Sequence, residues 1–225
     1  MGLLLLAGLG FAGYMLAKSE KPDTDTDDDD SEHKFLDFIS DTPDDFQTGT
    51  PLAMLDHLLA WLPGGFTSEQ KVKDAARYLL DGEGTLYYYG RPVADVIRMG
   101  DIKEAKKSGG DCSGITGTVL VHAGIVSSEW PIKYRRADDM RAASASDSVA
   151  VGSQRPGDIA CYNGHVTLVI TDPIAELDGH SYVLSMSGGD SSTFGNNLNA
   201  RAKIMVGNYR SSGPDQFIGY FRPKE

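Results

Sequence analysis

The hydrophobic pattern of the chain changes in its second half, and this change constrains the fold more than any other feature. After residue 157 the apolar residues come in short runs rich in Val, Ile, Tyr and Phe, and Gly, Asn, Asp and Pro separate the runs. Runs of this kind are typical of β-strands. The predicted strands lie within residues 158–163, 165–170, 181–187, 202–209 and 217–223.

The first half shows helical spacing instead. Leucines recur at helical intervals over residues 50–63, which begin Thr-Pro and are followed by Gly-Gly. A second helix is expected to begin after Thr67, which forms a predicted capping box with Gln70, and to end at Gly82 or Gly84.

A third helix is expected to begin at Cys112 and to close at Gly124. Helices that precede a series of short strands predict an α+β fold in which the helices pack on an antiparallel sheet. One folded domain is expected, because 225 residues bury one sizeable core once the unusual N-terminus is set aside.

Residues 1–17 contain no charged side chain and are expected to form a hydrophobic membrane-anchor helix. A cleaved signal peptide and a buried hydrophobic arm are the alternatives. Residues 18–45 are expected to form an acidic flexible linker, because so polar a run cannot bury enough apolar surface to order itself. The domain is then predicted to occupy residues 46–225.

Charge is concentrated in the linker. The whole chain carries a formal charge of −11, and residues 46–225 are close to neutral. No basic stripe is present, which argues against nucleic acid as the main partner. The two cysteines, Cys112 and Cys161, lack the spacing of a metal site, and the five histidines form no zinc motif, so neither a metal nor a cofactor is expected.

Cys112 has the sequence context of a nucleophile. The first turn of a helix favours the thiolate through its unpaired N–H groups and its dipole, so the position predicts a lowered thiol pKa. Gly109 and Gly110 permit a tight entry into the turn, and the small residues that follow Cys112 leave room for a substrate. The alternative is an inert cysteine at a helix start. Cys161, in the middle of a predicted strand, is interpreted as a packed structural thiol.

His165 is the candidate general base. The Arg155-Pro156-Gly157-Asp158 segment predicts a turn, and Asn163-Gly164 predicts a tight hairpin that leads into the strand beginning with His165. The side chain of His165 is expected to share one face of that strand with Thr167 and Val169. When a histidine lies beside a cysteine in the folded protein, it can take the thiol proton and later donate it to the leaving group.

Together these motifs resemble the NlpC-type family of papain-like cell-wall cysteine peptidases. The sequences DCSG (111–114), RPGD (155–158) and HVTLVI (165–170) are similar to the family's signatures and follow the same order. Upstream, LYYYGRP contains Tyr87, which best matches the family's active-site tyrosine, and residues 183–193 resemble a segment found in phage-encoded members. The resemblance covers roughly residues 70–223.

The resemblance implies a papain-like domain that hydrolyses amide bonds in the stem peptides of peptidoglycan without a cofactor. Cys112 would be the nucleophile and His165 the proton shuttle, with an acyl-enzyme intermediate. Asp111, Ser113 and the hydroxyl of Tyr87 would belong to the substrate-binding and oxyanion region around the backbone N–H groups near Cys112.

The residue that orients the imidazole departs from the family pattern, which often has His, Asn or Gln there. Ser185 occupies that position, and Asp190 or Asn197 are alternatives from the following loop. A serine orients the ring more weakly than a carboxylate does.

The resulting function is a membrane-tethered peptidoglycan hydrolase that faces the cell wall or is carried in a phage particle. Two alternatives remain open. One is a papain-like acyltransferase or deamidase, and the other is a non-catalytic structural or virion membrane protein with a peptidase-like fold.

Overall fold

The computed structural model describes residues 67–87, 92–186, 201–209 and 216–225. The predicted anchor, the linker and the helix over residues 50–63 lie outside the described residues, and the predicted domain boundaries stay predictions. No helix within the described ranges combines the length and the apolar character needed to cross a membrane.

Mixed α and β structure confirms the predicted α+β class. The helices are α4 (Ser68–Leu80), α5 (Ala94–Met99), α6 (Ile102–Ser108), α7 (Cys112–His122), α8 (Trp130–Lys133), α9 (Ala137–Met140) and the 3-10 turn η1 (Ala175–Leu177). The strands are β1 (Ser146–Val149), β2 (Ile159–Tyr162), β3 (His165–Val169), β4 (Tyr182–Met186), β5 (Ala202–Val206) and β6 (Phe217–Pro223).

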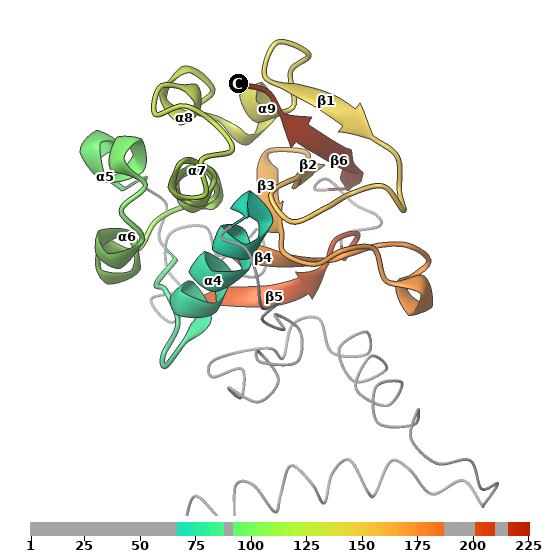
Figure 1. The fold of residues 1–225 in the computed structure, drawn as a ribbon, viewed down its shortest axis with the longest axis horizontal. Helices are drawn as coiled ribbons and strands as arrows, with labels where there is room; N and C mark the ends of the chain where they lie inside the picture. Colours follow the sequence, from blue (N-terminus) through green and yellow to red (C-terminus); the bar gives the residue numbers. More distant parts are fainter. Residues whose placement is uncertain (1–66, 88–91, 187–200, 210–215) are drawn as a thin grey trace, which may run out of the picture. The chain divides into compact units, whose positions relative to one another are not determined.

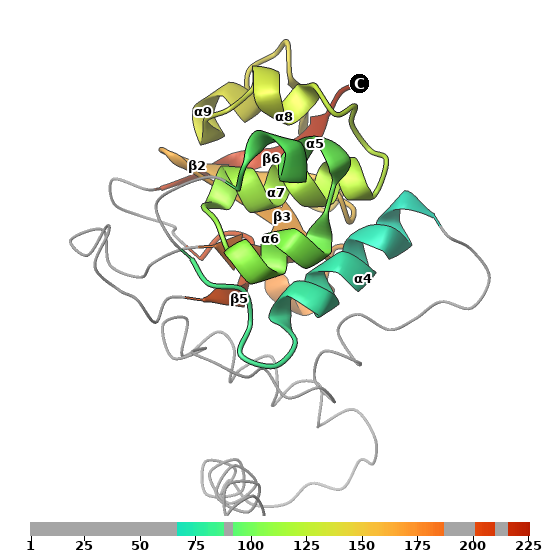
Figure 2. The same cartoon turned by 90° about the vertical axis from the view of Figure 1, so that its left-hand side faces the viewer.

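The strands form one antiparallel sheet in the order β1-β6-β2-β3-β4-β5. Strands β2 to β6 fall within the five runs predicted from the sequence. Helices α4 and α7 lie against one face of this sheet, as Figures 1 and 2 show, with α7 packed on β3. Every residue of β3, an inner strand of the sheet, is buried.

The second face of the sheet carries an apolar cluster of its own. Its buried members are Ala160, Tyr162, Val169, Val183, Met205 and Tyr220. Val169 belongs to this cluster, which agrees with the predicted alternation of side chains along β3. This face is rich in aromatic rings, and Tyr162 contacts the rings of Tyr209 and Phe217.

Local signals explain why α4 begins where it does. Thr67 is the N-cap, and its hydroxyl accepts a hydrogen bond from the backbone N–H of Gln70 at 3.2 Å. The side-chain amide of Gln70 donates to Asp74 at 2.9 Å. The described contacts therefore confirm the first half of the predicted capping box.

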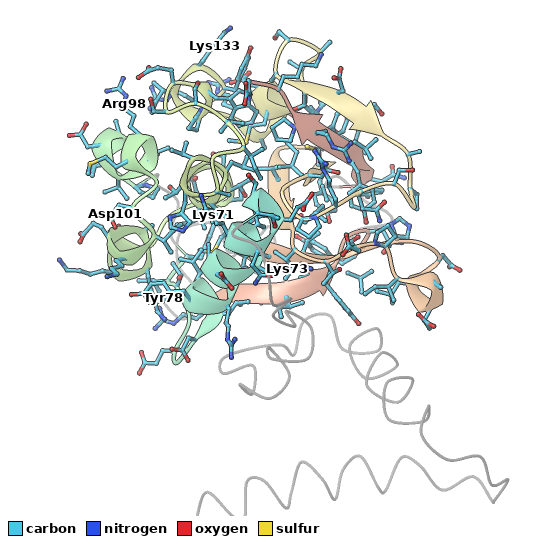
Figure 3. All side chains as sticks on the ribbon, in the orientation of Figure 1. Lys71, Lys73, Tyr78, Arg98, Asp101 and Lys133 are labelled. Atoms are coloured by element: carbon cyan, nitrogen blue, oxygen red, sulfur yellow. The ribbon has the colours of Figure 1, made fainter. Side chains whose placement is uncertain are left out.

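Helix α7 is the central helix, and small residues make that position possible. All residues from Ser113 to Leu120 are buried, and Gly114 and Gly117 lie among them. Small side chains allow the neighbouring helices and β3 to approach the α7 backbone closely. Charged side chains such as Arg98 and Lys133 project outward from the helices instead, where Figure 3 labels them.

The predicted β2–β3 hairpin is confirmed with a two-residue loop. Tyr162 and His165 are paired across the strands, and Asn163-Gly164 forms the connection. Gly164 has φ 69°, whereas Asn163 keeps a negative φ. The turn therefore needs one left-handed residue, which glycine supplies without a steric penalty. This tight turn fixes His165 as the first residue of β3.

Candidate active site

Cys112 is the first residue of α7, as the sequence predicts. Asp111 caps the helix, and its Oδ1 accepts a hydrogen bond from the backbone N–H of Gly114 at 2.7 Å. The hydroxyl of Ser113 donates to the carbonyl oxygen of Arg135 at 3.0 Å and lies 3.2 Å from Asp111 Oδ1. These hydrogen bonds join the first turn of α7 to its capping residue and to the backbone at Arg135.

Gly109 and Gly110 bring Tyr87 to this helix start. The backbone N–H of Gly110 donates to the carbonyl oxygen of Leu86 at 3.1 Å, and Tyr87 forms a parallel bridge with Gly110. Gly109 has φ 70°, and a Cβ placed there would collide with the Leu86 carbonyl oxygen. Only glycine allows this approach, which pairs Tyr87 with Gly110, two residues before Cys112 in the chain.

We therefore expect Gly109→Ala to lower the free energy of unfolding by more than about 2 kcal/mol, from the positive φ and the collision together. Gly124→Ala is the matched control, because Gly124 also has φ 70° but nothing lies within 4 Å of the added Cβ. That variant should lose about 1 kcal/mol. Urea denaturation of both proteins measures the difference, and equal losses would contradict the close approach.

The sulfur of Cys112 lies near the first residues of strand β3. The backbone N–H groups of Val166, Ser113 and Cys112 lie close enough to the sulfur to favour its thiolate form. Val166 directly follows His165 in the chain. The structure thus brings the predicted nucleophile to the strand that carries the predicted base, more than fifty residues away in sequence. Direct contact between sulfur and imidazole stays a prediction.

The predicted direction of the thiol pKa is wrong. Burial is the largest cause and raises the pKa of Cys112 to about 11, and the charge of Asp111 raises it further. The N–H groups of Val166, Ser113 and Cys112 favour the thiolate, as expected for a helix start, but they are outweighed. The sequence correctly predicts that the helix start favours the thiolate. It does not show how deeply the thiol is buried, and burial has the larger effect on the pKa.

Alkylation of Cys112 tests this environment. With a pKa of about 11, about one thiol in ten thousand is ionised at pH 7, so the alkylation rate with iodoacetamide should rise about tenfold per pH unit from pH 7 to pH 10. Peptide mapping by mass spectrometry assigns the adduct to Cys112. A rate that levels off below pH 9 would contradict the raised pKa.

Asp111→Asn provides a matched variant for the same measurement. Asparagine caps a helix as well as aspartate does, so the helix start is preserved while the charge is removed. Because Asp111 raises the pKa of Cys112, the variant should be alkylated faster than the wild-type protein at pH 8. An unchanged rate would show that the charge of Asp111 does not act on the sulfur.

His165 is buried, with 7% of its surface exposed. Its ring lies against the ring of Tyr162, its partner across the hairpin, with 5.6 Å between the ring centroids. Thr167 and Val169 share its face of β3, as predicted. The imidazole therefore lies at the boundary between the hairpin turn and the aromatic face of the sheet.

Ser185, the predicted third member, is fully buried on β4. Its Oγ lies 3.2 Å from the hydroxyl of Tyr209, a residue that the sequence pattern did not single out. Nothing local distinguishes Tyr209 from other aromatic residues in strands, so only the tertiary structure reveals the contact. Asp190 and Asn197, the alternatives, lie outside the described residues.

Asp158 of the RPGD turn is structural. The turn is confirmed by a hydrogen bond from the N–H of Asp158 to the carbonyl oxygen of Arg155 at 2.9 Å. The Asp158 carboxylate is 2% exposed, and Arg222 of β6 binds both of its oxygens at 2.8 Å. The residue belongs to a buried ion pair that ties the turn to β6. Arg222 had no signal in the sequence.

Cys161 is a packed thiol, as predicted. It is free and buried on β2, and burial raises its pKa far above the ordinary value. In the β2–β3 register it pairs with Val166, the residue whose backbone N–H favours the thiolate of Cys112. Among the described residues, no group of three or more His, Cys, Asp and Glu side chains could hold a metal ion.

Comparisons of the chain with protein-family models, with curated proteins and with solved structures give no match. The description of the site therefore depends on its geometry alone: a capped helix start, a cysteine on it, and a strand beginning with histidine beside the sulfur.

Proposed function

We propose that the protein is a cysteine peptidase or amidase of the papain-like, NlpC type that hydrolyses amide bonds in peptidoglycan stem peptides. The observation that carries the proposal is that the backbone N–H of Val166 lies close enough to the sulfur of Cys112 to favour its thiolate. The capped start of α7 is therefore close to the first residues of β3, and His165 is one of these residues.

The raised thiol pKa determines how such a site would work. Because the resting sulfur is protonated, His165 must remove the proton as the sulfur attacks the carbonyl carbon. The negative charge that develops on the carbonyl oxygen would be bound by the first-turn N–H groups of α7 and by the hydroxyl of Tyr87.

Collapse of that tetrahedral species breaks the C–N bond, and the amine leaves with the proton from His165. The substrate carbonyl is then a thioester on Cys112. Water, deprotonated by His165, attacks the thioester and releases the carboxylate product, and the sulfur recovers its proton. Neither a metal nor a cofactor is needed for these steps.

The arrangement around Cys112 bears on this assignment of roles. The residue as a whole is partly exposed, although burial dominates the surroundings of its thiol. Ser113 and Asp111 use their side chains within the fold, and so we assign them to holding the helix start and its backbone donors in place. Substrate contact by either side chain stays a prediction.

Membrane tethering and a place facing the cell wall or within a phage particle are part of the proposal. They rest on the uncharged residues 1–17 and the acidic residues 18–45. A tether of that length and composition would let the folded part reach a wall polymer while it stays attached to the membrane.

Digestion of purified muropeptides tests the function. The full-length protein in a mild detergent is incubated with muropeptides that differ in their stem peptides, and the products are analysed by mass spectrometry. We expect two products whose masses add up to the substrate plus one water. Intact muropeptides, in a sample that a known wall hydrolase degrades, would contradict the proposal.

A non-catalytic role is the second candidate, and the raised pKa of Cys112 favours it. An inert thiol at a helix start would give the same fold and the same hydrogen bonds. In this case the muropeptides bind without being cleaved, and binding is the same for the wild-type protein and for Cys112→Ala. Equilibrium binding of labelled muropeptides to both proteins separates the two candidates.

A further inference from the structure

We propose that Tyr209 is a positioning residue of the candidate active site, which orients the imidazole of His165 through the hydroxyl of Ser185. The inference rests on the proposed function for its kinetic consequences, although the orientation of the ring can be measured without a substrate. It assigns a role to an aromatic residue far from Cys112 in sequence.

The order of the strands places Tyr209 over β3. Strand β3 lies between β2 and β4 in the sheet. The ring of Tyr209 contacts Tyr162 on β2, with 5.1 Å between the ring centroids, and its hydroxyl lies 3.2 Å from Ser185 Oγ on β4. A single side chain that touches both outer strands has to cross the face of the strand between them.

The strand register shows where the crossing occurs. Tyr162 is the cross-strand partner of His165, and their rings are in contact. On the other side, the β3–β4 register ends with Leu168 paired to Leu184 and Val169 paired to Val183. Alternation along the strands places Ser185 on the same face of the sheet as Val183, and His165 on the same face as Val169. The contact between Ser185 and the imidazole is the inferred step.

The Tyr209 hydroxyl can act on His165 through the hydrogen bonds of Ser185. A serine has one proton and two lone pairs, so it can donate to one partner and accept a ring N–H from another. The Tyr209 hydroxyl lies within hydrogen-bond distance and can accept the serine proton. A hydroxyl that donates becomes a better acceptor, so the Tyr209 contact strengthens what Ser185 offers to His165.

Burial makes the arrangement specific. Ser185 is fully buried and His165 is 7% exposed, so little solvent competes for these groups. A buried serine supported by tyrosine would then fulfil the orienting function that an amide, imidazole or carboxylate fulfils elsewhere.

The alternative is that Tyr209 merely fills the aromatic face of the sheet. Tyr209→Phe removes the hydroxyl and keeps the ring, so packing is preserved. Tyr220→Phe is the matched control: Tyr220 is a buried tyrosine of the same face, and its hydroxyl lies 2.9 Å from Nδ1 of His180 rather than near β3. A packing role predicts similar effects for both variants.

Kinetics of muropeptide cleavage by the full-length protein give the first readout. We expect Tyr209→Phe and Ser185→Ala each to lower kcat about tenfold or more with KM unchanged. The double variant should be no slower than the slower single variant, because both changes break one chain of hydrogen bonds. Tyr220→Phe should keep the wild-type kcat. Additive losses, or an equal loss in Tyr220→Phe, would overturn the proposal.

Nuclear magnetic resonance of the imidazole nitrogens gives the second readout. The protein carries 15N-labelled histidine, and the missing signal in His165→Gln assigns the ring. We expect Tyr209→Phe and Ser185→Ala to shift the His165 signals toward a mixture of tautomers, and Tyr220→Phe to shift those of His180 instead. His165 signals that stay unchanged in both variants would overturn the proposal.

The two readouts distinguish failure of this inference from failure of the proposed function. A wild-type protein that cleaves no muropeptide but shows the expected shifts supports the positioning by Tyr209 and contradicts the peptidase. Cleavage with unchanged His165 signals in both variants supports the peptidase and overturns the role of Tyr209.

Discussion

Cys112→Ala should abolish muropeptide cleavage, with a loss of at least about 10⁴-fold in kcat. The physical reason is that no other described thiol can take its place: Cys161 is fully buried, and its raised pKa keeps it protonated. The measurement is product formation by mass spectrometry under the conditions used for the wild-type protein.

Two further variants make this result specific. Cys161→Ala should keep most of the activity, because the thiol on β2 only packs in the core. His165→Gln should be as inactive as Cys112→Ala, since neither half of the pair acts alone. Circular dichroism of each protein checks that the fold is intact. Cleavage by a folded Cys112→Ala protein would remove the cysteine from the mechanism altogether.

Arg222→Met should lower the free energy of unfolding by about 3 kcal/mol. The change leaves the Asp158 carboxylate buried at 2% exposure without the guanidinium that binds both of its oxygens. The value is taken at the low end of the range for buried pairs because Arg222 is itself 38% exposed and partly screened by solvent. Urea denaturation followed by circular dichroism measures the loss.

Arg141→Met is the matched control for this prediction. Arg141 pairs with Asp138 at 3.1 Å, and the carboxylate of that pair is 52% exposed. Breaking an exposed pair should cost less than about 1 kcal/mol. In addition, Asp158→Asn combined with Arg222→Met should recover part of the loss, because no buried charge then remains. Equal losses in Arg222→Met and Arg141→Met would contradict the buried pair.

Several elements were predictable because their signals are local. The start of α7 at Cys112 follows from a capping aspartate and a series of small residues, and both act within one helical turn. The five runs of β-branched and aromatic residues became strands β2 to β6. The two-residue turn at Asn163-Gly164 was predictable because its signal is also local, and it fixes the register of the hairpin.

Other elements were missed because their local signals are weak. Helices α5, α6, α8 and α9 have four to seven residues each, too few to show a clear apolar period. Strand β1 has the sequence SDSV, with two exposed polar residues in the middle, and it exists because β6 pairs with it. Tertiary contacts stabilise all of these segments.

The amino-acid sequence by itself determined the α+β class, the helix start at Cys112 and the strand start at His165, because capping and side-chain periodicity depend on neighbours along the chain. Only the tertiary structure decided that the thiol pKa is raised, that Arg222 binds Asp158, and that Tyr209 reaches Ser185. Desolvation and contacts between distant segments depend on how the whole chain packs, and no short stretch of sequence encodes them.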